Sequence, residues 1–102
     1  MSFFSVNSLL SAVKSLALAG APRGIRVNAL SPGVVDTPMI RAARPGEESD
    51  EAVTERMESL AALHPLGRVG TAHEVAEAAL QLLVAPWTTG AELLIDGGLS
   101  LA

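Results

Sequence analysis

The 102-residue sequence contains no cysteine and no tyrosine, and it carries little positive charge. Without cysteine it forms neither disulfide bonds nor reactive thiolates, which fits a cytoplasmic protein. Its seven basic and eleven acidic residues give a net charge of −4, so we expect no nucleic-acid partner. No run is long and apolar enough to span a bilayer, so we expect no membrane segment. Because His64 and His73 lack nearby ligand patterns, we expect them to be solvated and expect no metal site.

Hydrophobic residues make up 49% of the chain, which excludes disorder throughout, and 102 residues suffice for one small domain, 1–102. Residues 5–19 predict a helix, ended by Gly20 and Pro22. Its apolar side chains recur at spacings of three and four: Val6, Leu9, Leu10, Val13, Leu16 and Ala17. The opposite face carries one charge, Lys14, where a surface helix normally carries more. We therefore expect another subunit or a missing domain to cover this helix.

Residues 25–31 predict a strand buried on both faces, as is typical of parallel sheets. The strand stops at Pro32 and Gly33. Thr37 followed by Pro38 is typical of a helix N-cap with proline at the first helical position. A polar loop at the end of a parallel strand is where α/β proteins place their ligands. This loop is therefore a candidate binding site.

The remaining sequence predicts three helices and a second strand. A short helix at 38–43 and a polar loop at 44–50 precede a helix at 51–63. Another helix spans 71–84, with a capping box formed by Thr71 and Glu74 at its start. A strand at 91–95 is closed by a turn at 96–98, which completes the segment 91–98. The side chains expected to face inward from the two longer helices are Val53, Met57, Leu60 and Leu63, and Val75, Ala79, Leu82 and Leu83.

The order of elements is helix, strand, helices, strand, which indicates an α/β fold. Because helices join the two strands, we expect the strands to be parallel, with a right-handed crossover. Two strands make a poor sheet, since three or more are usually needed for independent stability. We expect these two strands to form the edge of a larger sheet, which is completed by oligomerisation or by a missing half.

Several segments resemble the C-terminal part of short-chain dehydrogenases/reductases. They occur in the family's order over nearly the whole chain. The chain itself is less than half the length of a family member. The matching segments are 15–17, 21–28, 31–37, 65–70, 74–76, 89–90 and 96–98. That family is a Rossmann-fold group of NAD(P)-dependent oxidoreductases. The resemblance implies a partial, doubly wound parallel sheet of Rossmann type, with the helix at 5–19 in a subunit interface. It also implies that the turn at 96–98 is an interface element.

The resemblance further implies a cofactor site in segment 25–37. The family pattern P-G-x-V-x-T falls on Pro32, Gly33, Val35 and Thr37. By analogy, Pro32 and Gly33 open the nicotinamide end of an NAD or NADP site. The Val35 backbone would meet the nicotinamide carboxamide, and the Thr37 hydroxyl would bond nearby. Residues 38–63 resemble the substrate-covering segment.

The sequence departs from the family pattern at the catalytic positions. The family's proton donor is a tyrosine four residues before a lysine, and these positions fall on Ser2 and Val6 when counted back without a gap. A serine hydroxyl is far too weak an acid to replace a phenol whose pKa is lowered by a nearby ammonium, and valine supplies no charge. The only lysine, Lys14, lies on a later turn of the helix. A glycine-rich loop for the pyrophosphate is also absent from the chain.

Other polar residues have structural interpretations. Asn28 inside a strand is expected to be a satisfied structural group. Arg68 is expected to bond loop carbonyls rather than an anion, and Trp87 is expected to pack near an interface. The acidic cluster in 47–58 is expected to be a solvated face. Four arginines have two open roles, which are pairing with that cluster and contacting a cofactor phosphate. These arginines are Arg23, Arg26, Arg41 and Arg44.

The sequence supports three hypotheses. The first is a truncated or fragmentary NAD(P)-dependent oxidoreductase for a carbonyl or alcohol substrate, inactive as this chain alone. The second is a non-catalytic oligomerisation module, which pairs with itself or with a full-length relative. The third is one half of a split enzyme whose N-terminal half is another chain. The sequence does not distinguish NAD from NADP and does not identify the substrate.

Overall fold

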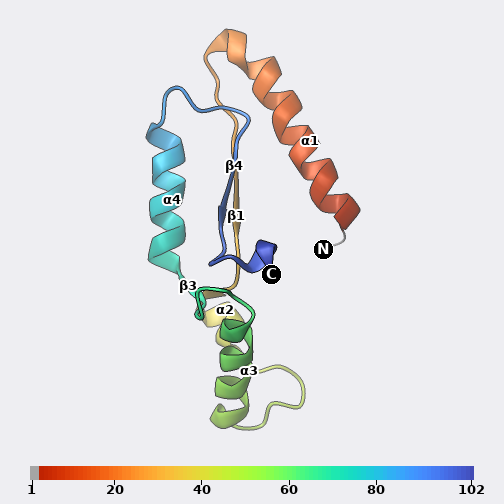
Figure 1. Cartoon of the computed structure of the whole chain (residues 1–102), viewed down its shortest axis with the longest axis vertical. Helices are drawn as coiled ribbons and strands as arrows, with labels where there is room; N and C mark the ends of the chain where they lie inside the picture. The colour runs from red at the N-terminus through yellow and green to blue at the C-terminus, as the bar shows by residue number, and fades with distance from the viewer. Residues whose placement is uncertain (1–2) are drawn as a thin grey trace. The chain divides into compact units, whose positions relative to one another are not determined.

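The computed structural model describes residues 3–102, with side chains described from Leu9 onward. In chain order the elements are α1 (Phe3–Gly20), η1 (Ala21–Arg23), β1 (Ala29–Pro32), β2 (Val35–Asp36), α2 (Pro38–Arg41), α3 (Asp50–Ala62), β3 (Gly70–Thr71), α4 (Ala72–Val84), β4 (Glu92–Ile95) and η2 (Leu99–Leu101) (Figure 1). The chain divides into two compact units. One consists of Met1–Ser31 and Glu77–Leu93, and the other of Pro32–Ala76 and Leu94–Ala102.

Helix α1 belongs to the first unit and confirms the helix predicted at 5–19. It ends where Gly20 and Pro22 predict, because the 3-10 turn η1 follows and Gly24 then adopts φ 72°. Glycine takes this left-handed conformation without the steric cost that a Cβ would bring. In this unit, α1 and α4 lie on opposite sides of the paired strands β1 and β4 (Figure 1).

Strands β1 and β4 pair in parallel, as predicted. The Ala29 N–H donates to Ala91 O over 2.8 Å, and the Gly33 N–H donates to Ile95 O over 3.2 Å. Both strands therefore advance by four residues in the same direction between these bonds, which is the spacing of a parallel ladder.

Strand β1 begins four residues later than predicted. Residues 25–28 lie outside it. There, a side chain rather than a strand backbone bonds to the backbone of the facing segment. Asn28 Nδ2 donates to Thr88 O over 3.1 Å, and Asn28 Oδ1 accepts from Ala91 N–H over 3.0 Å, so the satisfied structural role of Asn28 is confirmed. The expectation of burial on both faces is wrong. Ala29, Leu30 and Ser31 of β1 are half-buried and Pro32 is exposed.

Local capping positions the helices of the second unit. Thr37 is the N-cap of α2, with Pro38 at the first helical position, and this confirms the sequence prediction. Ser49 caps α3 through its side chain, which accepts from Ala52 N–H over 3.1 Å. Such caps satisfy N–H groups that have no partner inside the helix.

Strands β2 and β3 also lie in the second unit and were not predicted. They pair in parallel, with Val35 opposite Gly70 and Asp36 opposite Thr71. Each is two residues long, which is too short for an alternation of apolar residues to indicate a strand.

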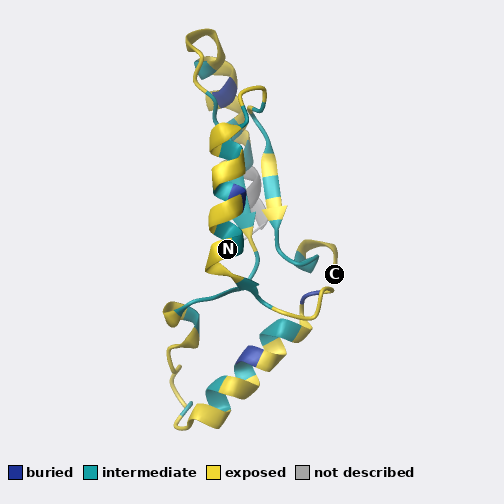
Figure 2. Ribbon diagram, turned by 90° about the vertical axis from the view of Figure 1, so that its left-hand side faces the viewer, coloured by how far each residue is buried: buried dark blue, intermediate teal, exposed yellow. Residues whose placement is uncertain are grey.

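Among the side chains described, from Leu9 to Ala102, neither unit buries a large apolar core (Figure 2). The buried apolar residues are Ala17 and Ala78 in the first unit and Met57 in the second. Met57 confirms the inward face predicted for α3, but Leu63 and Leu83 are exposed, which contradicts the prediction for them. Leu63 is the C-cap residue of α3 and so lies beyond its helical stripe. Leu83 is rotated by about 100° around α4 from the half-buried Leu82. Within residues 3–102, no helix combines the length and apolar character that crossing a bilayer requires.

Candidate functional site

Gly33 lies at a crowded point of the loop that follows β1. A Cβ at this position would lie 3.0 Å from Asp96 Cα, from Asp96 Cβ and from His64 Nε2. Contacts this short leave no space for a methyl group in a packed region. The glycine of the Pro-Gly pair is therefore required by the close approach of two other segments of the same unit.

His64 holds this loop from the end of α3. Its exposed fraction is 3%, so the prediction of a solvated His64 is wrong, whereas His73 is exposed on α4. The Val34 N–H donates to His64 Nε2 over 3.3 Å, and His64 Nδ1 lies 2.8 Å from Leu60 O. His64 follows the C-cap residue of α3, and its ring lies against Val34 and Gly33 of the loop after β1. A single histidine without a repeated spacing gave no signal for this role.

Strand β2 presents the backbone of Val35 at its outer edge. Gly70 N–H donates to Val34 O over 2.9 Å. Backbone groups of successive residues in a strand point to opposite edges, so the N–H and C=O of Val35 point away from β3. One residue there offers a donor and an acceptor side by side, which complements a primary carboxamide.

Thr37 and Asp36 are engaged by α2. Thr37 Oγ1 accepts from Ile40 N–H over 3.4 Å, so the donor of its hydroxyl remains for a ligand. Asp36 accepts from Arg41 Nε and, over 2.8 Å, from Arg41 Nη2. These hydrogen bonds hold the pKa of Asp36 below its usual value. Arg41 therefore pairs with Asp36, not with the acidic cluster of 47–58.

Arg56 organises the segment predicted to cover a substrate, although the sequence did not single it out. Its Nε donates to Glu47 Oε2 over 2.8 Å, its Nη1 to Ile40 O over 2.7 Å and its Nη2 to Ala42 O over 3.1 Å. The Arg44 N–H and then the Arg56 guanidinium lower the pKa of Glu47. One side chain of α3 thus fastens α2 and the loop behind it. Glu47 and Arg56 are nine positions apart in the sequence, which exceeds the separation of three or four that indicates a helical pair.

A cleft of about 330 Å³ in the second unit is lined by residues of this loop, of β3 and of the C-terminal turn, among them Val34, Thr71 and Asp96. Its other charged groups are paired, since Arg68 Nη1 and Nη2 donate to Glu74 Oε1 and Oε2, each over 2.8 Å. The Arg68 bonds, followed by those from Thr71, lower the pKa of Glu74 to about 2.

The capping box predicted at the start of α4 is confirmed. Thr71 N–H donates to Glu74 Oε1 over 3.0 Å, and Glu74 N–H donates to Thr71 Oγ1 over 3.1 Å. Arg68 also donates to Val69 O over 3.2 Å. Its structural role is therefore confirmed, but its principal partner is a carboxylate rather than the loop carbonyls that we expected.

The C-terminal turn closes the other side of the cleft. Asp96 Oδ1 accepts from Gly98 N–H and Oδ2 from Ser100 N–H, each over 3.0 Å. Hydrogen bonds from Ser100 lower the pKa of Asp96. Leu66 N–H donates to Gly97 O over 3.0 Å, which ties this turn to the segment behind His64. The loops that follow β1, α3 and β4 in the sequence are thus joined by hydrogen bonds into one cluster.

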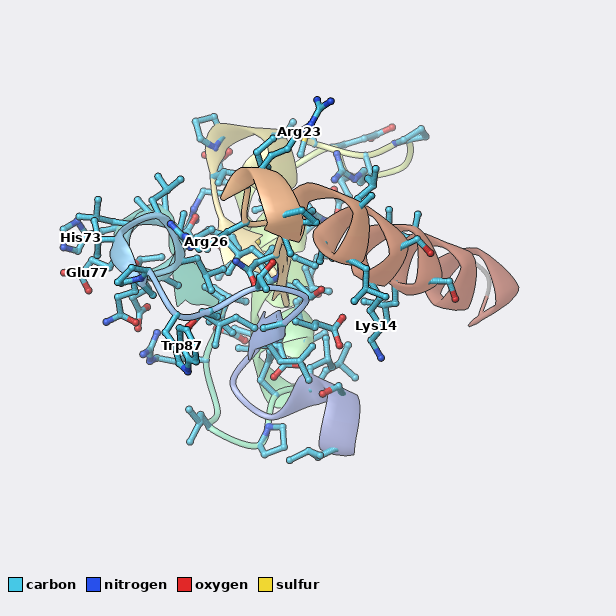
Figure 3. The ribbon with its side chains drawn as sticks, turned by 90° about the horizontal axis from the view of Figure 1, so that it is seen from above. Lys14, Arg23, Arg26, His73, Glu77 and Trp87 are labelled. Atoms are coloured by element: carbon cyan, nitrogen blue, oxygen red, sulfur yellow. The ribbon has the colours of Figure 1, made fainter. Side chains whose placement is uncertain are left out.

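In the first unit, Arg26 binds backbone carbonyl groups. Its Nη1 donates to Leu82 O over 2.8 Å and its Nη2 to Leu83 O over 2.7 Å, so it binds the end of α4 (Figure 3). Trp87 is 98% exposed, so the packing role predicted for it is not met within the described chain. It lies on the segment between α4 and β4, where neighbouring side chains do not enclose it.

Comparison with known proteins decides the family. Short-chain dehydrogenase srdC of Neurospora crassa is 39% identical over 98 residues, which are 94% of this chain and 34% of that protein. A family profile described as Enoyl-(Acyl carrier protein) reductase matches residues 5–100. The chain belongs to the short-chain dehydrogenase/reductase family.

Other relatives in the short-chain dehydrogenase/reductase family match to a similar extent. Carbonyl reductase family member 4 of Xenopus tropicalis is 42% identical over 97 residues, which cover 95% of this chain and 36% of that protein. The 3beta-hydroxysteroid dehydrogenase 1 of Eggerthella lenta is 44% identical over 90 residues, which cover 86% of this chain and 32% of that protein. The chain therefore spans about a third of the length of the curated relatives it matches.

Solved structures of the short-chain dehydrogenase/reductase family confirm the predicted fold class. Ligand-free aldohexose dehydrogenase of Thermoplasma acidophilum matches with a TM-score of 0.83 and 34% identity, covering 94% of this chain and 39% of that chain. A short chain dehydrogenase family protein from Francisella tularensis matches with a TM-score of 0.78 and 34% identity, covering 97% of this chain and 43% of that chain. The chain corresponds to the C-terminal part of an α/β family member with parallel strands.

The family pattern predicts the catalytic tyrosine and lysine positions at Ser2 and Val6. Ser2 lies outside the described residues, and Val6 lies within α1, where its side chain is not described. Lys14 is exposed farther along α1 (Figure 3). The sequence contains no tyrosine.

Proposed function

We propose that this chain supplies the nicotinamide side and the substrate-covering segment of an NAD(P)-dependent oxidoreductase that acts on a carbonyl or an alcohol. The observation that carries the proposal is the outward edge at Val35. Its N–H and C=O point away from β3, and the Thr37 hydroxyl lies two residues farther along the loop. Membership of the short-chain dehydrogenase/reductase family supports the same reaction class.

The residues of the loop fit a nicotinamide ring. The carboxamide of that ring carries a C=O and an NH₂, which match the N–H and C=O of Val35. Gly33 allows the surrounding segments to approach closely, and Thr37 retains a donor. When bound, the cofactor supplies the hydride chemistry, and the protein residues named here bind and orient its nicotinamide end.

The chain alone is not expected to reduce a carbonyl. Protonation of the product oxygen needs a group of suitable acidity, and the sequence has no tyrosine to supply it. We therefore expect the purified 102-residue chain to show no oxidation of NADH or NADPH with carbonyl substrates. Such activity above background would contradict this part of the proposal.

A chimera tests the nicotinamide role. Residues 21–102 of this chain replace the matched part of the Thermoplasma aldohexose dehydrogenase, whose own upstream residues are kept. We expect dinucleotide-dependent turnover in the chimera and in its Val35→Ala form. The Val35→Pro form lacks the N–H at this position and is expected to lose turnover. Equal turnover in the two variants, with unchanged thermal unfolding, would exclude the role proposed for Val35.

A second candidate function is assembly with another copy of the chain. The exposed fractions of Leu9, Leu16 and Leu18 on α1 are 56%, 59% and 78%, and the helix carries one charge, at Lys14. An exposed apolar patch of this kind is typical of an interaction site. In sedimentation velocity we expect a dimer or larger species, which Leu16→Glu shifts to monomer. Ser15→Glu places the same charge on the adjacent exposed position and is the control. A monomeric unaltered chain would exclude self-assembly.

A further inference from the structure

His64 joins two segments that the proposed function treats separately. It follows α3, the long helix of the substrate-covering segment, and its ring reaches the loop behind β1. Both contacts use backbone groups, Leu60 O on the side of α3 and Val34 N–H on the side of the loop. His64 is 3% exposed. Its Nε2 would lie only 3.0 Å from a Cβ added at Gly33, which leaves no room for a side chain there.

The two backbone partners fix the protonation of the ring. An amide N–H only donates, so the Nε2 that faces Val34 carries a lone pair. A carbonyl only accepts, so Nδ1 carries the proton and donates to Leu60 O over 2.8 Å. The imidazole is therefore neutral, in the Nδ1–H tautomer.

We propose that His64 is a positioning residue of the nicotinamide site. It orients the Val34–Val35 peptides by accepting from Val34 N–H, and it couples this loop to α3 through Leu60 O. The proposal rests on the function proposed above, because it gives that site a link to the substrate-covering segment. Displacement of α3 by a substrate would therefore also act on the nicotinamide loop through the His64 ring.

The tautomer and the Val34 amide test the link without any ligand. In the ¹⁵N-labelled 102-residue chain at neutral pH, we expect the His64 ring to show the Nδ1–H tautomer and the Val34 amide to exchange slowly with solvent. His73, which is exposed, serves as the internal reference. A proton on Nε2 of His64, or an unprotected Val34 amide, would overturn the proposal.

Two variants separate hydrogen bonding from space filling. Phenylalanine in His64→Phe fills the ring volume without an acceptor, and we expect Val34 exchange to become roughly tenfold faster, as for one lost hydrogen bond. Glutamine in His64→Gln carries an oxygen that can replace Nε2, and we expect it to restore most of the protection. If Phe protects Val34 and Gln does not, His64 only fills space. His73→Gln is the matched control and is expected to leave Val34 unchanged.

A ligand experiment distinguishes this proposal from the proposed function. NAD⁺ and NADP⁺ are titrated separately while the Val35 amide signal is followed in the same chain. We expect a saturable shift in the unaltered chain and in His64→Gln, and a several-fold weaker response in His64→Phe. If neither dinucleotide shifts Val35 in the unaltered chain, the proposed cofactor role fails. The tautomer and exchange results then still decide whether His64 orients the Val34–Val35 peptides.

Discussion

Arg68 and Glu74 form a bidentate ion pair, in which both guanidinium Nη atoms lie 2.8 Å from carboxylate oxygens. The pair bridges the loop behind α3 and the first turn of α4, so it fastens the start of the helix that lines the cleft. The pKa of Glu74 in the folded chain is about 2, against an ordinary value of 4.5. Its contribution to folding is therefore present above pH 4.5 and is lost as the pH falls toward 2.

A pH series tests this contribution. We expect Glu74→Gln to lower the thermal midpoint at neutral pH and the difference from the unaltered chain to disappear between pH 4.5 and about 2. Glutamine still serves in a capping box, so the change isolates the charge. Because both side chains are partly solvated, salt should also reduce the difference. Glu58→Gln, at an exposed position of α3, is the control. A difference that persists unchanged at pH 2 would contradict the assignment.

Gly33→Ala is expected to destabilise the second unit. The added methyl group meets Asp96 and His64 at 3.0 Å, and overpacking of this kind costs about 1–3 kcal/mol. Urea unfolding measures the change. Gly70→Ala is the matched control, since its Cβ would meet only Val34 O, at an ordinary 3.8 Å. Equal midpoints for the two variants would show that the loop behind β1 is looser than the structure indicates.

Arg26→Lys is expected to release the end of α4. An ammonium cannot reproduce the fork that places Nη1 on Leu82 O and Nη2 on Leu83 O. Loss of one hydrogen bond from a charged group costs about 1.5–3 kcal/mol. Denaturant unfolding and hydrogen exchange of residues 85–90 measure it. Arg23→Lys, at an exposed position of η1, should leave both measurements unchanged.

Arg56→Lys is expected to loosen α2 and the loop behind it. The guanidinium makes three bonds, to Glu47, to Ile40 O and to Ala42 O, and a lysine makes at most part of this set. Trypsin should therefore cleave after Arg41 several-fold faster, while the thermal midpoint changes little. Glu48→Gln, at a neighbouring exposed position, is the control. An unchanged cleavage rate would argue against this role for Arg56.

The sequence predicted the features that depend on neighbours along the chain. The capping box of Thr71 and Glu74 and the N-cap at Thr37 were found because each uses a fixed local spacing. The helix boundaries at Gly20 and Val84 follow from glycine and proline positions in the same way. Local rules of this kind hold whatever the chain folds against.

The sequence did not predict features that depend on distant segments. His64 and Arg56 each bind backbone carbonyls or N–H groups that carry no side-chain signature. The exposure of Leu83 was missed because periodicity assumes that every apolar position finds a surface to pack on. The cofactor roles proposed for Val35 and Thr37 were predicted from the family pattern, since their residue types alone are common in loops.

Trp87 is the single tryptophan of a chain without tyrosine, and 98% of its surface is open to water. The intrinsic fluorescence of the chain therefore comes from one solvated indole. Unfolding changes the surroundings of that indole little, so emission is a poor reporter of the folding transition. Burial by a second molecule would instead move the emission to shorter wavelength. Trp87 is thus a label-free reporter for any molecule that covers the segment between α4 and β4.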